Sequence, residues 1–218
     1  MTKSKSEINR QIGKHQVDEQ KNSILDAAEK LFLRNGIEQT LMIDIAKEAG
    51  ITKITLYRYF PNRDEIALQI HAHTMNKLAK AMGANELDFS IENAKRVIRL
   101  MIQNFDVWRD DYRLMGMFDN LYLDRPATSA SSQWTKAELP QLLVYPLVRD
   151  DSKYDGALIK RFDLVMSTTI WFLEKLALRG ELTWSDKNTP LNKHLELFEE
   201  MILGYLNRLM ENDYDEKK

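Results

Sequence analysis

The side chains of this chain that are best suited to chemistry lie in the segment from Gly50 to Arg63. The segment holds three cations and no acid. Hydroxyl groups can bond phosphates, Lys and Arg can bond phosphates or guanine edges, and an aliphatic side chain can pack on a thymine methyl group. The residues that a helix here would present outward are Thr52, Lys53, Ile54, Thr55, Tyr57, Arg58 and Tyr59.

The spacing of three other residues predicts the element that would carry these side chains. Two helices that cross steeply through a short turn need a small residue at the crossing, a glycine in the turn and an apolar anchor on the second helix. Ala46, Gly50 and Leu56 meet these three needs in order. The sequence therefore predicts a helix-turn-helix whose second helix starts at Thr52 as N-cap and runs through Tyr59.

Helical periodicity covers most of the chain, which predicts an all-α protein. Apolar residues from Ile24 to Phe32 follow one helix face, and Gly36 can end that helix. The next helix is expected from Met42 to Ala49 with Thr40 as N-cap, and Asn62 begins a helix that reaches about Met82. Further helices are expected from about Ser90 through Trp108 and at about 111–124, 134–149, 156–180 and 190–211.

Composition excludes several classes of protein. The chain has 218 residues and a net charge of −2, and it contains no cysteine. The absence of cysteine excludes disulfide scaffolds, thiolate metal sites and cysteine nucleophiles. No segment reads as a membrane span or secretory signal, so a cytoplasmic protein without membrane association is expected. His71 and His73 are two positions apart and would point to different sides of a helix. We expect no catalytic residues, no metal site and no cofactor.

Residues 24–66 resemble the N-terminal domain of the tetracycline-repressor (TetR/AcrR) family of bacterial regulators. Ile43, Ile54 and Arg63 stand where that family usually has other residues. The resemblance implies a homodimer that binds a palindromic operator in double-stranded DNA, and a C-terminal helical domain that binds a small-molecule effector. The residues that carry the resemblance are Ala27, Ala28, Phe32, Gly36, Thr40, Asp44, Ile45, Ala46, Gly50, Thr55, Leu56, Tyr57, Phe60 and Pro61.

The resemblance also implies a division of labour among the DNA-binding residues. Bases or groove edges would be contacted by Thr52, Lys53, Ile54 and Arg58, and phosphates by Thr40, Thr55, Tyr57, Tyr59 and Arg63. Two alternatives stay open. The two tyrosines could instead pack in the core of the small domain, and Lys53 and Arg58 could be solvated surface charges.

The C-terminal region is expected to dimerise and to bind the effector. Helix 156–180 has two apolar stripes and the last helix has one, which is more apolar surface than one neighbour covers. The alternative is that both helices are buried within one monomer. The expected interface residues are Leu158, Phe162, Val165, Phe172, Phe198, Met201, Ile202 and Tyr205. A hydrophobic or aromatic effector would contact Phe105, Trp108, Met117, Phe118, Tyr122, Trp134, Phe162 and Met166, each of which could instead be ordinary core.

These observations predict four segments: a basic, flexible tail at 1–17, a helix-turn-helix domain at 18–64, an effector-binding and dimerisation domain at 65–212, and a tail at 213–218. The tail at 1–17 could alternatively contact a minor groove or phosphates. The predicted function is a sequence-specific transcriptional regulator, a repressor released by its effector. The alternative is a helical protein-binding adaptor, or a ligand-binding module without DNA activity.

Overall fold

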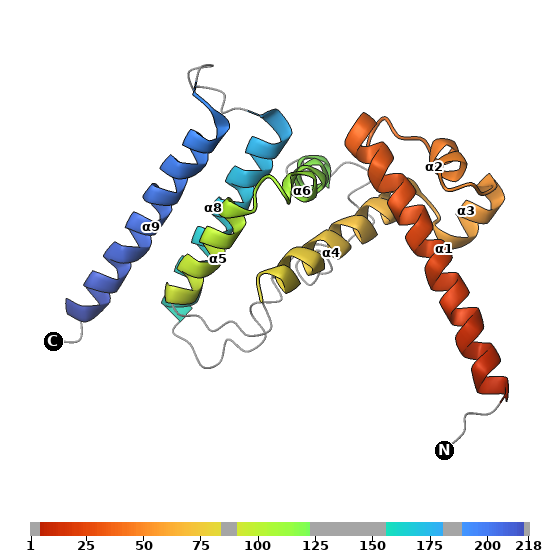
Figure 1. Ribbon diagram of the computed structural model, residues 1–218, viewed down its shortest axis with the longest axis horizontal. Coiled ribbons are helices and arrows are strands. Elements are labelled where there is room, and N and C mark those ends of the chain that lie inside the picture. The colour runs from red at the N-terminus through yellow and green to blue at the C-terminus, as the bar shows by residue number, and fades with distance from the viewer. Residues whose placement is uncertain (1–4, 84–90, 123–155, 181–188, 216–218) are drawn as a thin grey trace. The chain divides into compact units, whose positions relative to one another are not determined.

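Every regular element that the structure describes is a helix. The computed structural model describes residues 5–83, 91–122, 156–180 and 189–215 (Figure 1). The chain divides into unit 1, Met1–Ala72, and unit 2, His73–Lys218, and helix α4 runs through the boundary. The all-α prediction is confirmed. The helices are α1 Lys5–Asn35, α2 Met42–Glu48, α3 Lys53–Tyr59, α4 Arg63–Ala81, α5 Ile91–Gln103, α6 Arg109–Tyr122, α8 Gly156–Arg179 and α9 Leu191–Asp215.

Helix α1 begins earlier than the sequence analysis expected. Residues 5–17, predicted as a flexible tail, form the first turns of α1. Side chains from His15 to Glu19 are exposed, and an ion pair of 3.2 Å joins His15 Nδ1 to Glu19 Oε1 one turn later. Such i,i+4 pairs favour a helix without any burial. The helix ends as predicted at Gly36, whose φ of 83° few other residues adopt.

The core of unit 1 joins α1 to the helices that follow it. The buried side chains of α1 recur at helical spacing, from Ile24 to Phe32. Helix α2 adds Ile45 and Ala46, and α3 adds Leu56. These short helices have seven residues each, too few to be stable alone in water, so the packing of α2 on α1 and of α3 on α2 stabilises them.

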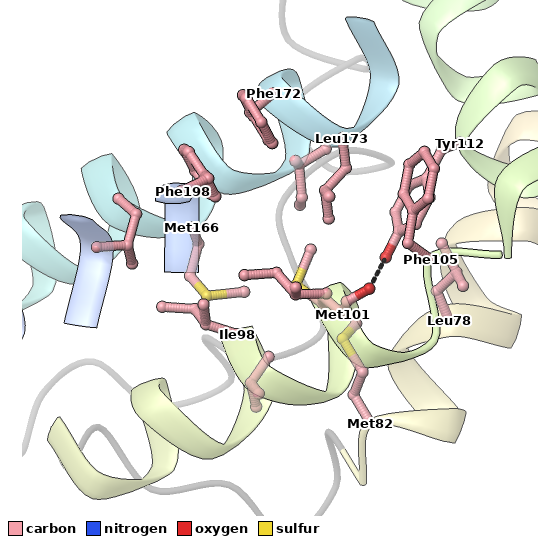
Figure 2. Packing of buried hydrophobic residues seen from close by; sticks show 14 of the residues in the cluster. Leu78, Met82, Ile98, Met101, Phe105, Tyr112, Met166, Phe172, Leu173 and Phe198 are labelled. Atoms are coloured by element: carbon pink, nitrogen blue, oxygen red, sulfur yellow. Dashed lines mark hydrogen bonds between the residues drawn. The ribbon is translucent and has the colours of Figure 1, made fainter. Parts of the chain in front are cut away.

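Unit 2 has a continuous apolar core built from α5, α8 and α9 together with parts of α4 and α6. The rings of Phe172 on α8 and Phe198 on α9 are stacked, with centroids 3.9 Å apart (Figure 2). The Tyr112 hydroxyl donates to the Met101 carbonyl at 3.4 Å, which joins α6 to α5. Helices α6 and α8 approach closely at Gly116, where an added Cβ would lie 2.8 Å from Leu178 Cδ1.

A bidentate ion pair ties α4 to α6 inside unit 2. Lys77 Nζ lies 2.7 Å from Asp111 Oδ1 and 2.8 Å from Oδ2, and Asp111 is buried. Asp110 and Asp111 both lie in the first turn of α6, where acids interact favourably with the helix dipole. The periodicity gave no sign that Asp111 turns inward, because its partner lies 34 residues earlier in the chain.

One expected helix is shorter in the structure, and another falls outside the described residues. The helix expected from about Ser90 through Trp108 starts at Ile91 and ends at Gln103, and single turns follow, with Phe105 N donating to Ile102 O and Trp108 N to Asn104 O. The helix expected at 134–149 lies outside the described residues.

Among the described helices none has both the length and the apolar character needed to cross a membrane.

A buried histidine makes the stability of the protein depend on pH. His71 on α4 is 2% exposed, and this burial lowers its pKa from 6.5 to about 4. Burial disfavours the charged imidazolium, so the folded chain keeps His71 neutral at pH values where the unfolded chain protonates it. The contribution of His71 to the free energy of unfolding is therefore fully present above pH 6.5 and is lost as the pH falls towards 4.

We predict that lowering the pH from 7.5 to 5 reduces the free energy of unfolding by about 2 kcal/mol through His71. Urea unfolding of the full chain at both pH values measures this loss, and His71→Gln should remove it. The matched control is His73→Gln on the same helix, because His73 is exposed and should leave the loss in place. An equal loss in His71→Gln would contradict the assignment.

Candidate nucleic-acid interface

The turn between α2 and α3 is built by backbone hydrogen bonds around one glycine. Gly50 has a φ of 67° and donates to Lys47 O at 3.1 Å, while Ile51 N donates to Ala46 O at 2.9 Å. This pair of bonds is the Schellman arrangement that ends a helix and turns the chain sharply. Ala46 is buried in unit 1 as the sequence analysis predicted for the small residue of the motif. The helix-turn-helix is therefore confirmed.

Helix α3 starts with the predicted cap. Thr52 Oγ1 accepts from Thr55 N at 3.1 Å and lies 2.9 Å from Thr55 Oγ1. The cap satisfies one of the free amides of the first turn. Since the two hydroxyls bond each other, Thr52 and Thr55 have less capacity for phosphate than the sequence alone suggested.

The outer face of α3 is defined by the residue that faces inward. Leu56 is fully buried. At about 100° per residue, Ile54 and Arg58 each lie about 160° from Leu56 and form the ridge on the opposite side of the helix. Both are exposed, and Ile54 is 79% exposed. These two side chains are thus the most outward part of α3.

Lys53 and Tyr57 occupy one flank of that ridge. The Lys53 ammonium lies 5.7 Å from the centroid of the Tyr57 ring, a cation–π contact one turn apart. Tyr57 is 45% exposed and Tyr59 is partly buried. Packing in the core, the alternative considered for both tyrosines, therefore describes Tyr59 better than Tyr57. Helix α3 has two cations and no acid, so its whole exposed face favours an anionic surface.

Two residues predicted to contact phosphate make hydrogen bonds within unit 1. Thr40 is 1% exposed and its hydroxyl donates to Gly36 O at 2.8 Å, so burial removes it from the surface and from the α2 N-cap position, which Leu41 occupies. Arg63 Nη1 donates to Glu38 O at 2.7 Å and lies 3.5 Å from Thr40 O. Arg63 thereby ties the start of α4 to the turn between α1 and α2. Arg63 Nε also lies 3.7 Å from Asp64 Oδ1.

Sequence reasoning missed two exposed apolar residues beside the motif. Leu41 is 58% and Ile43 is 38% exposed, at the start of α2. The sequence analysis gave neither residue a DNA-binding role and noted Ile43 only as a departure from the family's usual residue. The signal that could have found Leu41 is the absence of a capping side chain at its position.

The expected effector residues fall into two groups in unit 2. Phe105 and Met166 are buried in its main core, with Trp108 partly buried against it. Phe118 and Tyr122 are buried on α6 with ring centroids 4.7 Å apart, and Met117 beside them is partly buried. The structure does not describe Trp134 or the side chain of Phe162.

Four of the six expected dimer residues whose side chains the structure describes are core residues of unit 2. The apolar stripes of α8 and α9 are wide, and part of each stripe packs within the monomer, so these residues are buried there. Met201 is 56% exposed, and Leu164, Trp171 and Leu197 are exposed beside the expected set. The side chains of Leu158 and Phe162 are outside the described residues, and Tyr205 is partly buried. The residues placed in the core are Val165, Phe172, Phe198 and Ile202.

The arrangement of α1 to α3 is that of a helix-turn-helix domain, and comparison with known proteins identifies its family. Residues 24–70 match the family model described as bacterial regulatory proteins, tetR family. The resemblance described from the sequence is therefore confirmed for the N-terminal domain, whose residues match this family of regulators.

Two curated relatives are similar over part of the chain. The fatty acid metabolism regulator protein of Bacillus subtilis is 29% identical over 92 residues, which are 42% of this chain and 46% of that protein. The HTH-type transcriptional activator FasR of Mycolicibacterium smegmatis is 28% identical over 138 residues, 62% of this chain and 61% of the relative. The chain thus spans about half to three fifths of the length of these relatives.

A solved structure shares the fold over most of the chain. The transcriptional regulator FadR from Bacillus subtilis, in complex with stearoyl-CoA, has a TM-score of 0.53 and 18% identity. The match covers 83% of this chain and 96% of that one. An N-terminal helix-turn-helix domain followed by a helical C-terminal domain is therefore the fold of this protein.

We predict that Arg63→Ala lowers the free energy of unfolding by about 1–3 kcal/mol, because hydrogen bonds from a charged donor to two carbonyls are lost. Thermal or urea unfolding of the full chain measures the change. Arg58→Ala is the matched control, since its exposed side chain should change stability by less than about 0.5 kcal/mol. Equal stability of the two variants would show that the hydrogen bonds of Arg63 do not stabilise the fold.

Proposed function

We propose that this protein is a transcriptional regulator that binds a palindromic operator as a homodimer through α3. The observation that carries the proposal is the composition of the exposed face of α3. Lys53, Ile54 and Arg58 point away from the buried Leu56 and no acid lies among them. A helix with cations and an apolar tip on one face fits a DNA major groove, where it can meet phosphates, guanine edges and thymine methyl groups.

An effector with a long apolar chain is the second part of the proposal. The core of unit 2 is rich in aromatic and methionine side chains, which adapt to apolar ligands. The relatives include a protein named for fatty acid metabolism and a structure that holds stearoyl-CoA. A long-chain acyl thioester is therefore the effector class to which we assign the C-terminal domain. Repression released by the effector is our proposed mode, with activation as the alternative that the name of FasR supports.

The dimer interface is proposed to lie on the outer faces of α8 and α9. Leu164 and Trp171 on α8 are two turns apart, and Leu197 and Met201 on α9 are one turn apart, so each pair shares one side of its helix. All four are more than half exposed. Two such helices from each chain can form a four-helix interface. These residues replace the core residues named in the sequence analysis, and Met201 belongs to both sets.

We predict that Leu164→Glu with Met201→Glu converts the dimer to a monomer, because charges would enter the centre of an apolar interface. Sedimentation equilibrium of the full chain measures the mass. Val107→Glu is the matched control, since Val107 is 76% exposed and lies outside α8 and α9. A wild-type chain that is monomeric at micromolar concentration would refute the proposed dimer.

The proposed function is tested by selecting DNA from a random duplex pool with the full-length protein at low salt. We expect an enriched palindromic sequence whose half-sites lie about one helical turn apart. Lys53→Ala should change the base preference within each half-site. Arg58→Glu should weaken binding at least tenfold, because it removes a cation from the outer ridge and adds an acid. Gel retardation with the selected duplex measures both effects.

Stearoyl-CoA added to the bound duplex should release the protein, with coenzyme A alone as the control. If stearoyl-CoA does not release a protein that still binds the duplex, the acyl effector is rejected. The proposed DNA-binding function then still stands. If no sequence is enriched and Arg58→Glu changes nothing, the DNA function fails. The helical adaptor then becomes the better interpretation.

A further inference from the structure

Ile54 is the most exposed large apolar residue among those that the structure describes. It is 79% exposed, and it lies on the seven-residue helix α3, one turn before Arg58. A single exposed isoleucine on an ordinary surface needs no explanation. Its position is what distinguishes Ile54, because it lies on the ridge opposite Leu56, with a cation on either side along the helix.

The neighbours of Ile54 define what can approach it. Arg58 follows it by one turn on the same ridge, and Lys53 precedes it and is in contact with the Tyr57 ring. An apolar partner protein would have to bury both cations without an acid from α3 to compensate them, which is costly. A DNA groove offers phosphates to the cations and a methyl group on each thymine to the isoleucine. The ridge thus fits DNA better than an apolar protein surface.

We infer that Ile54 determines operator specificity by packing on the C5 methyl group of one thymine in each half-site. This inference rests on the proposed DNA-binding function and adds to it the base that one residue recognises. Isoleucine has no hydrogen-bonding group, so it can distinguish thymine from other bases only by apolar contact. The other bases lack this methyl group in the major groove.

The spacing along α3 places a second contact near this thymine. Four residues of helix rise about 6 Å, and base pairs rise about 3.4 Å, so Ile54 and Arg58 contact positions about two base pairs apart. The thymine is therefore expected within about two base pairs of the guanine or phosphate that Arg58 contacts.

The contact is tested by replacing each thymine of the selected duplex, one position at a time in both half-sites, with deoxyuridine. Deoxyuridine keeps every hydrogen-bonding group of thymine and lacks only the methyl group. Burial of one methyl group corresponds to about fourfold in affinity, so we expect about fifteenfold weaker binding by the wild-type dimer at one symmetric position. Fluorescence anisotropy with labelled duplexes measures the dissociation constants.

The variant arm shows whether Ile54 makes the contact. Ile54→Ala should bind the thymine and deoxyuridine duplexes equally, and Ile54→Val should retain part of the difference. Both variants should keep the wild-type melting temperature, because the side chain is exposed. Val107→Ala, an exposed apolar residue of unit 2, should retain the full wild-type difference.

Two results would overturn the inference while the DNA function stands. One is tight binding to the selected duplex with no position at which deoxyuridine weakens it. The other is an unchanged deoxyuridine penalty in Ile54→Ala. If no duplex is enriched at all, the proposed function fails and the inference fails with it.

Discussion

The position of α3 depends on one buried side chain, Leu56. The helix has seven residues and Leu56 is the only one of them that is buried. A helix of this length is not stable by itself, so its existence and its direction both come from that anchor, from the Thr52 cap and from the turn at Gly50. Every exposed residue of α3 takes its orientation from Leu56, since the ridge of Ile54 and Arg58 is defined as the side opposite it. The chemistry of the surface is thus set by a residue that never reaches the surface.

Local patterns predicted most of the helix-turn-helix because its signals lie close together in the sequence. The Thr52 cap, the Gly50 turn and the Asn62 cap, whose Oδ1 accepts from Glu65 N at 2.8 Å, each depend on residues within a few positions. The outward residues of α3 could also be predicted, because they lie within four positions of Leu56 in the sequence. Helix periodicity likewise placed α8 and α9 within a few residues of their observed bounds.

The contacts that the sequence did not reveal join residues far apart in the chain. Arg63 was predicted to contact phosphate, and the structure adds a bond to a carbonyl 25 residues away. The ion pair of Asp111 with Lys77 is a second case, since the two residues are 34 positions apart. A periodic stripe shows that a residue is buried, and it does not show whether its own chain or a second chain covers it. The net charge of −2 likewise gives no sign of the acid-free α3, because it is a sum over the whole chain.

The bonds that Arg63 makes have a consequence for how the sequence can change. Its acceptors are the main-chain oxygens of Glu38 and Thr40, which every amino acid provides. The side chain of Glu38 is exposed, so it could be replaced by residues of other charge or size without loss of this anchor. The surface next to the motif can therefore diverge between paralogous proteins while α4 keeps its attachment.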